Sequence, residues 1–476
     1  MNAESFNSLL LQVFPYEPTN GQHTVIGKLS KFITETWDKE NSLFVLKGYA
    51  GTGKTTIVSA LVNALPKIQK RSALLAPTGR AAKVLAGYSG KQANTIHRKI
   101  YFARTTKEGT IALKLQQNLH KQTLFIVDEA SMIQNSSMTD FSLFSARNLL
   151  DDLFQYVYSG EQCKLLFIGD TAQLPPVGLG HSPALDLEFL RKSYDLSIDC
   201  YELTEVVRQA SASGILVNAT IIRNLVNRDE WRLPIFSINT FRDIRRISGA
   251  DLEDALNTAY SSSDKENNVV ICRSNKRANI FNQEIRRRIL FLEEEINTSD
   301  FMMVVKNNYF WLPEGSVAGF IANGDIIELL RIRKIEEMYG FRFADVTIRF
   351  LDYPDEKELD VKIMMDTIMS ESPALSSADN NRLFQEVLND YDDTPSRRGK
   401  IEKVKVNPYF NALQVKFSYS LTCHKTQGGQ WDTVFIDQGY LNEKIMNTEY
   451  LKWLYTAVTR ATRRVFLINF EEKFFD

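Results

Sequence analysis

The stretch SLFVLKGYAGTGKTTIVSALVNAL, residues 42–65, joins an apolar strand, a glycine-rich turn and a helix. From Gly48 to Thr55 it fits the pattern GxxxxGK followed by a hydroxyl residue, in the strand-then-helix context that this motif requires. The glycines let the backbone wrap a phosphate with its N–H groups turned inward, and the helix N-terminus adds the positive end of its dipole. The stretch therefore predicts a phosphate-binding loop in an α/β domain of the P-loop NTPase class.

The contacts expected from this loop are those of a nucleoside triphosphate. Lys54 supplies a point charge to the β- and γ-phosphates, and Thr55 offers its hydroxyl to Mg²⁺. The loop residues predicted to bind the nucleotide are Gly48, Ala50, Gly51, Thr52, Gly53, Lys54, Thr55 and Thr56.

A second apolar run, LFIVDEAS at residues 124–131, delivers two acids to a strand end. Asp128 is predicted to hold Mg²⁺, directly or through water. Glu129 is predicted to polarise the water that attacks the γ-phosphate.

A third run, KLLFIGDTAQLPP, starts at Lys164 and ends in Asp170 and Gln173, before two prolines that forbid further strand or helix. Successive parallel strands end at one edge of a sheet, so these side chains are expected beside the same nucleotide. Gln173 is predicted to contact the γ-phosphate or the attacking water and to report hydrolysis.

The rest of the chain consists of strand-then-helix units and one region in which β-forming side chains alternate with polar ones. The first 205 residues repeat short apolar runs followed by helices, which indicates a parallel sheet covered on both faces. A second such set starts at 268–289 and is completed by 415–470. Between them, residues 324–366 alternate β-forming side chains around a turn at Tyr339-Gly340, which predicts a small inserted antiparallel barrel. Residues 371–402 are polar, and YDDTPSRRGK at residues 391–400 is expected to be a flexible loop.

The composition of the chain bears on whether it binds nucleic acid, spans a membrane or contains disulfides. The chain has 476 residues, of which 44% are hydrophobic, and a net charge of −1, so any nucleic-acid binding must come from a local basic groove. The start of the chain has no basic region before an apolar run, and no stretch approaches the length that spans a bilayer. Four scattered cysteines without a CxxC pair disfavour a zinc site or a disulfide framework and favour the cytoplasm: Cys163, Cys200, Cys272 and Cys423.

Taken in order, eight motifs between Gly48 and Ile468 resemble those of superfamily 1 helicases of the 5′→3′ branch, the RecD-like and Dda-like group. They are GYAGTGKTT, LLAPTGRAAKVL, ANTIHR, VDEAS, GDTAQLPPVG, LTEVVRQA, SLTCHKTQGGQWDTVFID and YTAVTRATRRVFLI. The resemblance implies two RecA-like domains with ATP in the cleft between them and single-stranded DNA across both. It further implies a β-hairpin pin in the first domain and an SH3-like β-barrel insert in the second. The implied boundaries are 1–205 for the first domain, 98–120 for the pin, 206–325 and 414–476 for the second domain, and 326–413 for the insert.

The resemblance also assigns residues to the nucleotide. Gln22 resembles the glutamine that recognises adenine, and Arg208 and Arg460 resemble two arginines that reach the γ-phosphate from the second domain. Gly428 resembles a phosphate-facing glycine of the same family.

The DNA contacts implied by the family fall on both domains. They are Thr78 and His97 in the first domain, and Thr422, His424, Lys425 and Asn275 in the second. Hydroxyl groups, backbone N–H groups and lysines suit phosphates and carry no sequence information. In the pin, Tyr101 and Phe102 are predicted either to stack on the terminal base pair of a duplex or to pack the root of the hairpin.

The expected function is that of an ATP-driven motor that walks on single-stranded DNA and unwinds the duplex at a single-strand junction, in replication or repair. ATP and Mg²⁺ are the expected cofactors. Two alternatives stay open at this point: an RNA helicase or a translocase that does not separate strands, and a non-motor ATP-switched DNA clamp or loader.

Overall fold

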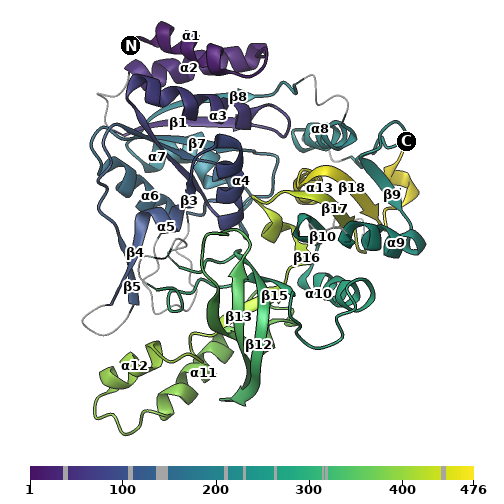
Figure 1. Ribbon diagram of the computed structural model, residues 1–476. Helices are drawn as coiled ribbons and strands as arrows, with labels where there is room; N and C mark the ends of the chain where they lie inside the picture. Colours follow the sequence, from purple (N-terminus) through teal and green to yellow (C-terminus); the bar gives the residue numbers. More distant parts are fainter. Residues whose placement is uncertain are drawn as a thin grey trace.

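The computed structural model describes residues 1–35, 41–105, 111–135, 148–207, 213–228, 232–261, 265–313, 316, 320–440 and 446–476. Two sheets with their helices lie beside each other, and a barrel with a helical pair lies below them in Figure 1. In the described part of the chain, none of the helices combines the length and the apolar character needed to cross a membrane.

The first sheet has six parallel strands in the order β3-β2-β6-β7-β1-β8. The strands are β1 (Ser42–Gly48), β2 (Arg71–Ala76), β3 (Ala93–Thr95), β6 (Thr123–Val127), β7 (Lys164–Gly169) and β8 (Ser197–Leu203). Its helices are α1 (Ala3–Val13), α2 (Asn20–Glu35), α3 (Lys54–Ala64), α4 (Gly79–Ser89), α5 (Ile96–Ile100), α6 (Leu149–Tyr158) and α7 (Leu187–Ser193). The side chains of β6 and β7 are buried throughout, because helices cover both faces of the sheet. The neighbouring strands β6, β7 and β1 thus bring the acidic pair, the Gln173 loop and the phosphate loop to one edge.

The second sheet has five parallel strands in the order β16-β10-β17-β18-β9. They are β9 (Ile244–Ile247), β10 (Asn268–Cys272), β16 (Ser420–Thr422), β17 (Trp431–Asp437) and β18 (Ala461–Ile468). The helices of this domain are α8 (Gly214–Val226), α9 (Gly249–Tyr260), α10 (Asn275–Glu284) and α13 (Thr448–Val458).

Residues 324–366, with their alternating β-forming side chains, contribute three strands to a closed barrel of five. The five are β11 (Phe301–Val304), β12 (Ile326–Met338), β13 (Phe341–Phe350), β14 (Leu359–Met364) and β15 (Leu413–Phe417). Tyr339 and Gly340 make the predicted turn between β12 and β13, with φ angles of 57° and 69° that suit a tight hairpin turn. The barrel strands extend beyond the expected 326–413, because β11 pairs with both β12 and β15 and thereby closes the sheet edge.

The loop predicted at YDDTPSRRGK, residues 391–400, is non-helical up to Ser396, whereas residues 397–400 begin a helix. The polar segment 371–402 contains α11 (Ser377–Asn389) and most of α12 (Arg397–Lys405), whose N-caps are Ser376 and Ser396. The two helices bury Leu383, Val387 and Val404 against the barrel residues Phe341 and Phe343. A few apolar residues within a polar sequence therefore suffice, because the barrel supplies the surface that they cover.

The predicted fold class is confirmed: two parallel-sheet domains, a β-hairpin in the first and a β-barrel in the second. The hairpin consists of β4 (Tyr101–Thr105) and β5 (Ile111–Leu115), paired antiparallel with Tyr101 opposite Leu115. Its tip, 106–110, lies outside the described residues.

A buried ion pair fastens the barrel to the second sheet. Arg286, just after α10, donates to both carboxylate oxygens of Asp300 over 2.8 and 2.9 Å, and the two side chains are 2% and 0% exposed. Asp300 precedes β11 and also accepts hydrogen bonds from the Asn297 amide and the Tyr419 hydroxyl. The barrel is therefore held to α10 and to the segment before β16.

We predict that Asp300→Ala lowers the free energy of unfolding by about 3–5 kcal/mol, since it leaves the Arg286 charge buried without its partner. The matched control is Glu295→Ala, which breaks the exposed pair of Glu295 with Arg342 and should cost less than about 1 kcal/mol. Urea unfolding measures both changes. Equal losses in the two variants would contradict the role given to the buried pair.

Candidate nucleotide and nucleic-acid sites

The phosphate loop has the conformation that its glycines allow. Gly51 and Gly53 have φ angles of 75° and 84°, in the left-handed region that favours glycine. The Lys54 ammonium donates hydrogen bonds to the carbonyl oxygens of Gly48 over 2.6 Å and Tyr49 over 2.9 Å. The lysine charge is thus held against the loop.

Two carboxylates at the ends of the neighbouring strands β6 and β7, Asp128 and Asp170, interact with this charge. Asp128 accepts hydrogen bonds from the Tyr88 hydroxyl over 2.6 Å and from the Glu129 amide over 2.8 Å. Burial raises the pKa of Asp128, with a further rise from the charge of Glu129, and the Lys54 charge opposes both. Burial likewise raises the pKa of Asp170 against the influence of Lys54. Burial therefore disfavours negative charge on Asp128 and Asp170, and the Lys54 charge favours it.

The oxygen atoms here fit a magnesium ion. The Thr55 side chain is exposed in the first turn of α3, and Asp128 directly follows β6, which β7 separates from the phosphate-loop strand β1. Mg²⁺ binds one or two protein oxygens and takes its remaining ligands from phosphates and water. Within the described ranges, no cluster of three or more His, Cys, Asp or Glu residues could hold a metal ion. A Mg²⁺ ion at this place would therefore depend on nucleotide phosphates.

Gln22 lies against the phosphate loop and is 2% exposed. Its amide nitrogen donates to the Thr52 carbonyl over 3.1 Å, and its amide oxygen accepts from the Thr19 amide over 2.9 Å. Both ends of the amide are thus engaged, and its contact with adenine stays a prediction.

Arg460 reaches from the second domain to the acidic pair of the first. It is 4% exposed, lies 3.7 Å from a Glu129 carboxylate oxygen, and donates to the Gly429 carbonyl over 3.3 Å. The structure thus brings together Arg460 and Glu129, which are far apart in sequence. Arg208, the other predicted arginine, lies outside the described residues.

Gly428 has a packing role that the sequence did not reveal. A Cβ atom at this position would lie 2.7 Å from the Ala81 Cβ and 3.2 Å from the Thr78 hydroxyl oxygen, and its φ is 73°. The glycine therefore permits the second domain to approach the start of α4. The observed neighbours of Gly428 are these side chains, and its contact with phosphate stays a prediction.

The Gln173 loop is held by side chains of the second domain. The Tyr455 hydroxyl donates to Asp170 over 2.6 Å, the Thr456 hydroxyl accepts from the Leu174 amide over 2.9 Å, and the Gln427 amide donates to the Leu174 carbonyl over 2.5 Å. Sequence reasoning missed these three residues. Their position within the last two of the eight helicase-like motifs was the one sequence feature that could have indicated a role for them.

Gln173 itself is 7% exposed, and its side-chain oxygen is buried without a hydrogen-bond partner in the described part of the chain. A buried polar atom left unpaired costs about 1–3 kcal/mol. The loop thus keeps one amide group available for a ligand or a water molecule.

The predicted DNA contacts of the first domain differ in accessibility. Thr78 caps α4 and accepts from the Ala81 amide over 3.2 Å. His97 is half-buried beside the Tyr101 ring, and burial lowers its pKa to about 4, so the imidazole is neutral at pH 7. Tyr101 is 6% exposed and donates to Asp152, which favours packing at the hairpin root, whereas Phe102 is 41% exposed.

In the second domain the predicted contacts gather near the ends of β16 and β10. Thr422, His424 and Lys425 are half-buried, and partial burial lowers the pKa of Lys425 to about 8. Nearby Lys416 of β15 also has a pKa of about 8, lowered by burial and by the Lys425 charge. Asn275 is less available, since its amide donates to the Glu371 carbonyl over 2.9 Å.

We predict that Lys425→Met stabilises the fold at pH 7, on the order of 1–2 kcal/mol after solvent screening. Below pH 8 the folded protein carries a partly buried charge on Lys425. Above pH 8 the folded lysine loses its proton while the unfolded one keeps it up to about pH 10.4, so the penalty fades as pH rises. Urea unfolding at pH 7 and pH 9.5 should show a larger gain at pH 7. Lys31→Met, at an exposed position of α2, serves as control, and an equal gain there would count against the effect.

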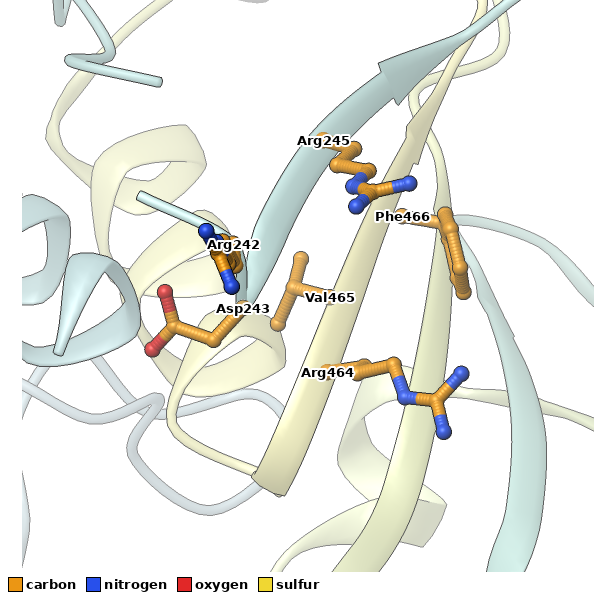
Figure 2. A pocket seen from close by; sticks show the side chains of 6 residues that line it. All are labelled: Arg242, Asp243, Arg245, Arg464, Val465 and Phe466. Carbon is orange, nitrogen blue, oxygen red and sulfur yellow. The ribbon is translucent and has the colours of Figure 1, made fainter. Parts of the chain in front are cut away.

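A basic pocket of about 170 Å³ lies at the opposite edge of the second sheet, between β9 and β18. Figure 2 shows Arg245 and Arg464 on the same side of these strands as Phe466. The carboxylate of Asp243 is engaged at the start of α8, by the Ser213 hydroxyl and the Gly214 amide. The pocket is separate from the site at Arg460. Charged side chains such as Arg245 on the edge strand β9 disfavour pairing of that strand with another chain.

Comparison with known proteins finds similarity over both domains. An AAA domain model matches residues 30–224, and a UvrD-like helicase C-terminal domain model matches residues 417–468. The chain is 26% identical over 475 residues to the ATP-dependent DNA helicase dda of Enterobacteria phage T4, covering 94% of this chain and 99% of that protein. It is 33% identical over 174 residues to the ATP-dependent RecD2 DNA helicase of Deinococcus radiodurans, covering 37% of this chain and 21% of that protein. A crystal structure of the Bacteroides Pif1 helicase with ADP-AlF3 and single-stranded DNA matches with a TM-score of 0.47 and 16% identity, over 96% of this chain and 93% of that one.

The two matched models fall on the two sheets, and the phage relative aligns along nearly the full length of both chains. The geometry agrees with them, because the phosphate loop, the acidic pair and Arg460 meet at one cleft. The chain is therefore similar in both domains to helicases of the RecD-like and Dda-like group of superfamily 1, as its eight motifs predicted.

Proposed function

We propose that the chain is an ATP-dependent DNA helicase, which hydrolyses ATP while moving 5′→3′ along single-stranded DNA and unwinds the duplex ahead of it. The observation that carries this proposal is the approach of Arg460 to Glu129, at 3.7 Å across the two domains. An arginine supplied by a second domain stabilises the charge of a transferring phosphoryl group only while the domains are closed. The nucleotide thereby sets the arrangement of the domains. The full-length similarity to the phage T4 helicase supports the same activity.

In this proposal the first domain holds ATP and the second completes the catalytic site. Lys54 and the loop N–H groups bind the phosphates, and Glu129 takes a proton from the attacking water. Arg460, which pairs with Glu129 here, turns its guanidinium to the γ-phosphate, joined by Arg208. Gln22 binds adenine. A Mg²⁺ ion held by Thr55 and Asp128 supplies positive charge to the phosphates.

The DNA strand is proposed to contact Lys425, while Lys416, which is buried and donates to the carbonyls of Thr367 and Ser370, acts through its charge alone. Both lysines have pKa values of about 8 because burial disfavours their charge. A nearby DNA phosphate would raise these pKa values again, since an opposite charge favours the protonated amine. Thr422 and His424 lie next to Lys425, and Thr78 and Phe102 extend the same contact to the first domain. A cytoplasmic location is also proposed, since the four cysteines form no disulfide with one another.

An unwinding assay tests the proposal with three duplexes that carry a 5′ single-stranded tail, a 3′ tail, or an RNA tail. We predict ATP-dependent strand separation of the 5′-tailed DNA alone. Glu129→Gln should bind ATP and DNA but hydrolyse about 10²–10⁴-fold more slowly, because it lacks the general base. Lys54→Ala, which should lose ATP binding, is the control for nucleotide affinity.

Other outcomes of this assay identify other functions. Preference for the RNA tail would indicate an RNA helicase. DNA-stimulated hydrolysis without strand separation, increasing with strand length, would indicate a translocase. Hydrolysis that does not depend on strand length would indicate a clamp or loader.

We predict that affinity for an oligothymidine strand falls as pH rises from 7 to 9, by up to about tenfold for each lysine that loses its proton. The sign follows from the pKa values of about 8 for Lys416 and Lys425, which leave both amines charged below that pH and neutral above it. Lys425→Arg should bind equally well at pH 7 and lose about half of the pH dependence, since arginine stays protonated. Fluorescence anisotropy at constant ionic strength measures both. A wild-type affinity that does not change with pH would argue against an interaction of these lysine charges with phosphate.

A further inference from the structure

The phenol of Tyr455 lies at the point where the two domains and the phosphate loop meet. Tyr455 belongs to α13 of the second domain and is 1% exposed. Its hydroxyl accepts a hydrogen bond from the Ala50 amide of the phosphate loop over 2.8 Å. The same hydroxyl donates to Asp170, at the start of the Gln173 loop, over 2.6 Å. One atom therefore joins the element that holds the nucleotide to the element predicted to sense it.

The Tyr455 hydroxyl pairs with one main-chain donor, the Ala50 amide, and with one of the two carboxylate oxygens of Asp170. A phenol has one proton to donate, and here Asp170 receives it. Burial raises the pKa of Asp170, and the bond from Tyr455 opposes this rise, so the hydroxyl favours the charged carboxylate. The second oxygen of Asp170 accepts from the Ala172 amide over 2.9 Å and shapes the loop before Gln173. The bond to Tyr455 thus fixes the start of this loop.

The end of the loop is held by the same domain. Leu174, directly after Gln173, contacts the Thr456 hydroxyl through its amide and the Gln427 side chain through its carbonyl. Gln173 therefore lies between two points that α13 and its neighbourhood control. Its unpaired oxygen is placed by the second domain although the residue belongs to the first.

We propose that Tyr455 is a positioning residue for hydrolysis and its coupling to movement, which holds the phosphate loop and the Gln173 loop in one arrangement while the domains are closed. Opening of the domains withdraws α13 and releases both loops together. This inference rests on the proposed ATPase and helicase activity and adds a residue to it. Arg460 lies on the turn that follows the same helix, so closure brings the arginine and the tyrosine to the site in one movement.

Tyr450 offers a matched control on the same helix. It is 2% exposed, and its hydroxyl accepts from the Gln438 amide over 2.9 Å, within the second domain. Tyr450→Phe and Tyr455→Phe each remove one buried hydroxyl from α13. Tyr455→Phe removes bonds that join the two domains, whereas the bond between Tyr450 and Gln438 lies within the second domain.

The test compares ATP turnover, the KM for ATP, and base pairs opened per ATP on a 5′-tailed duplex. Tyr455→Phe should lower kcat by about tenfold or more and leave KM within about threefold, because phosphate contacts remain while the placement of Gln173 is lost. Base pairs opened per ATP should fall by at least about fivefold. Tyr450→Phe should stay within about twofold of the wild type in all three quantities.

Two further readouts separate positioning from general stability. In Tyr455→Phe the acid limb of kcat against pH should move to higher pH, because Asp170 loses a bond that favours its charged form. Asp170→Asn removes that charge from the other side of the bond, so adding Tyr455→Phe to it should change kcat by less than about twofold. If Tyr455→Phe does not fold, Asp170→Asn with Tyr450→Phe as control tests the same bond.

Failure of the inference differs from failure of the proposed function. A wild-type protein without DNA-stimulated hydrolysis would overturn the proposed function. An active wild type together with a Tyr455→Phe variant that matches Tyr450→Phe would overturn the positioning role alone. Additive effects of Asp170→Asn and Tyr455→Phe would also overturn it.

Discussion

The charge of Lys54 is the constraint on which the site depends, because it favours the charged forms of two carboxylates, Asp128 and Asp170, that burial disfavours. Asp128, Glu129 and Asp170 follow neighbouring strands that end at one edge of the first sheet. Burial raises the pKa of Asp128 and of Asp170, and the Lys54 charge opposes both rises. Glu129, next to Asp128, lies 3.7 Å from the guanidinium of Arg460, a cation that the second domain supplies. Electrostatics and domain closure are therefore linked in this protein.

The closed cleft is held by contacts that cross it in both directions. Tyr49 of the phosphate loop packs into the core cluster of the second domain, with the Arg223 guanidinium 4.5 Å from its ring centre and the Asn227 amide bonded to its hydroxyl. Tyr455 of the second domain reaches back to the loop at Ala50. Interdigitated side chains of this kind have few intermediate arrangements, since packed interiors tolerate little deformation. Opening is therefore expected to be a step between two states and not a gradual drift.

The barrel takes part in this closure from the other side of the molecule. The Arg286–Asp300 pair fixes it to the second sheet, while Lys83 of α4 in the first domain donates to the Leu351 carbonyl and lies 3.6 Å from Asp352. The contact with α4 is exposed on the lysine side and so is weaker than the buried pair. A rigid attachment to one domain and a lighter contact with the other suit an element that moves with the second domain.

The sequence by itself determined the features that depend on a few neighbouring residues. The phosphate loop, the acidic strand end and the turn at Tyr339-Gly340 were all predicted, because glycine conformations, strand ends and helix starts are set within one short segment. The order of the motifs was sufficient to predict both sheets and the nucleotide cleft between them. The local pattern was insufficient for α11, where the barrel supplies the apolar surface, and for β11, whose pairing closes the barrel.

Only the tertiary structure decided which side chains meet across the cleft. Tyr455 and Asp170 are 285 residues apart, and Gln427 and Leu174 are 253 apart, so no spacing in the sequence indicates their bonds. The burial of Tyr101 and the lowered pKa values of Lys416 and Lys425 likewise arise from surfaces contributed by other elements. The chemical type of a residue limits which bonds its side chain can make. The packing of two sheets and a barrel determines which of these bonds it does make, because desolvation and partner distance exist only in the folded chain.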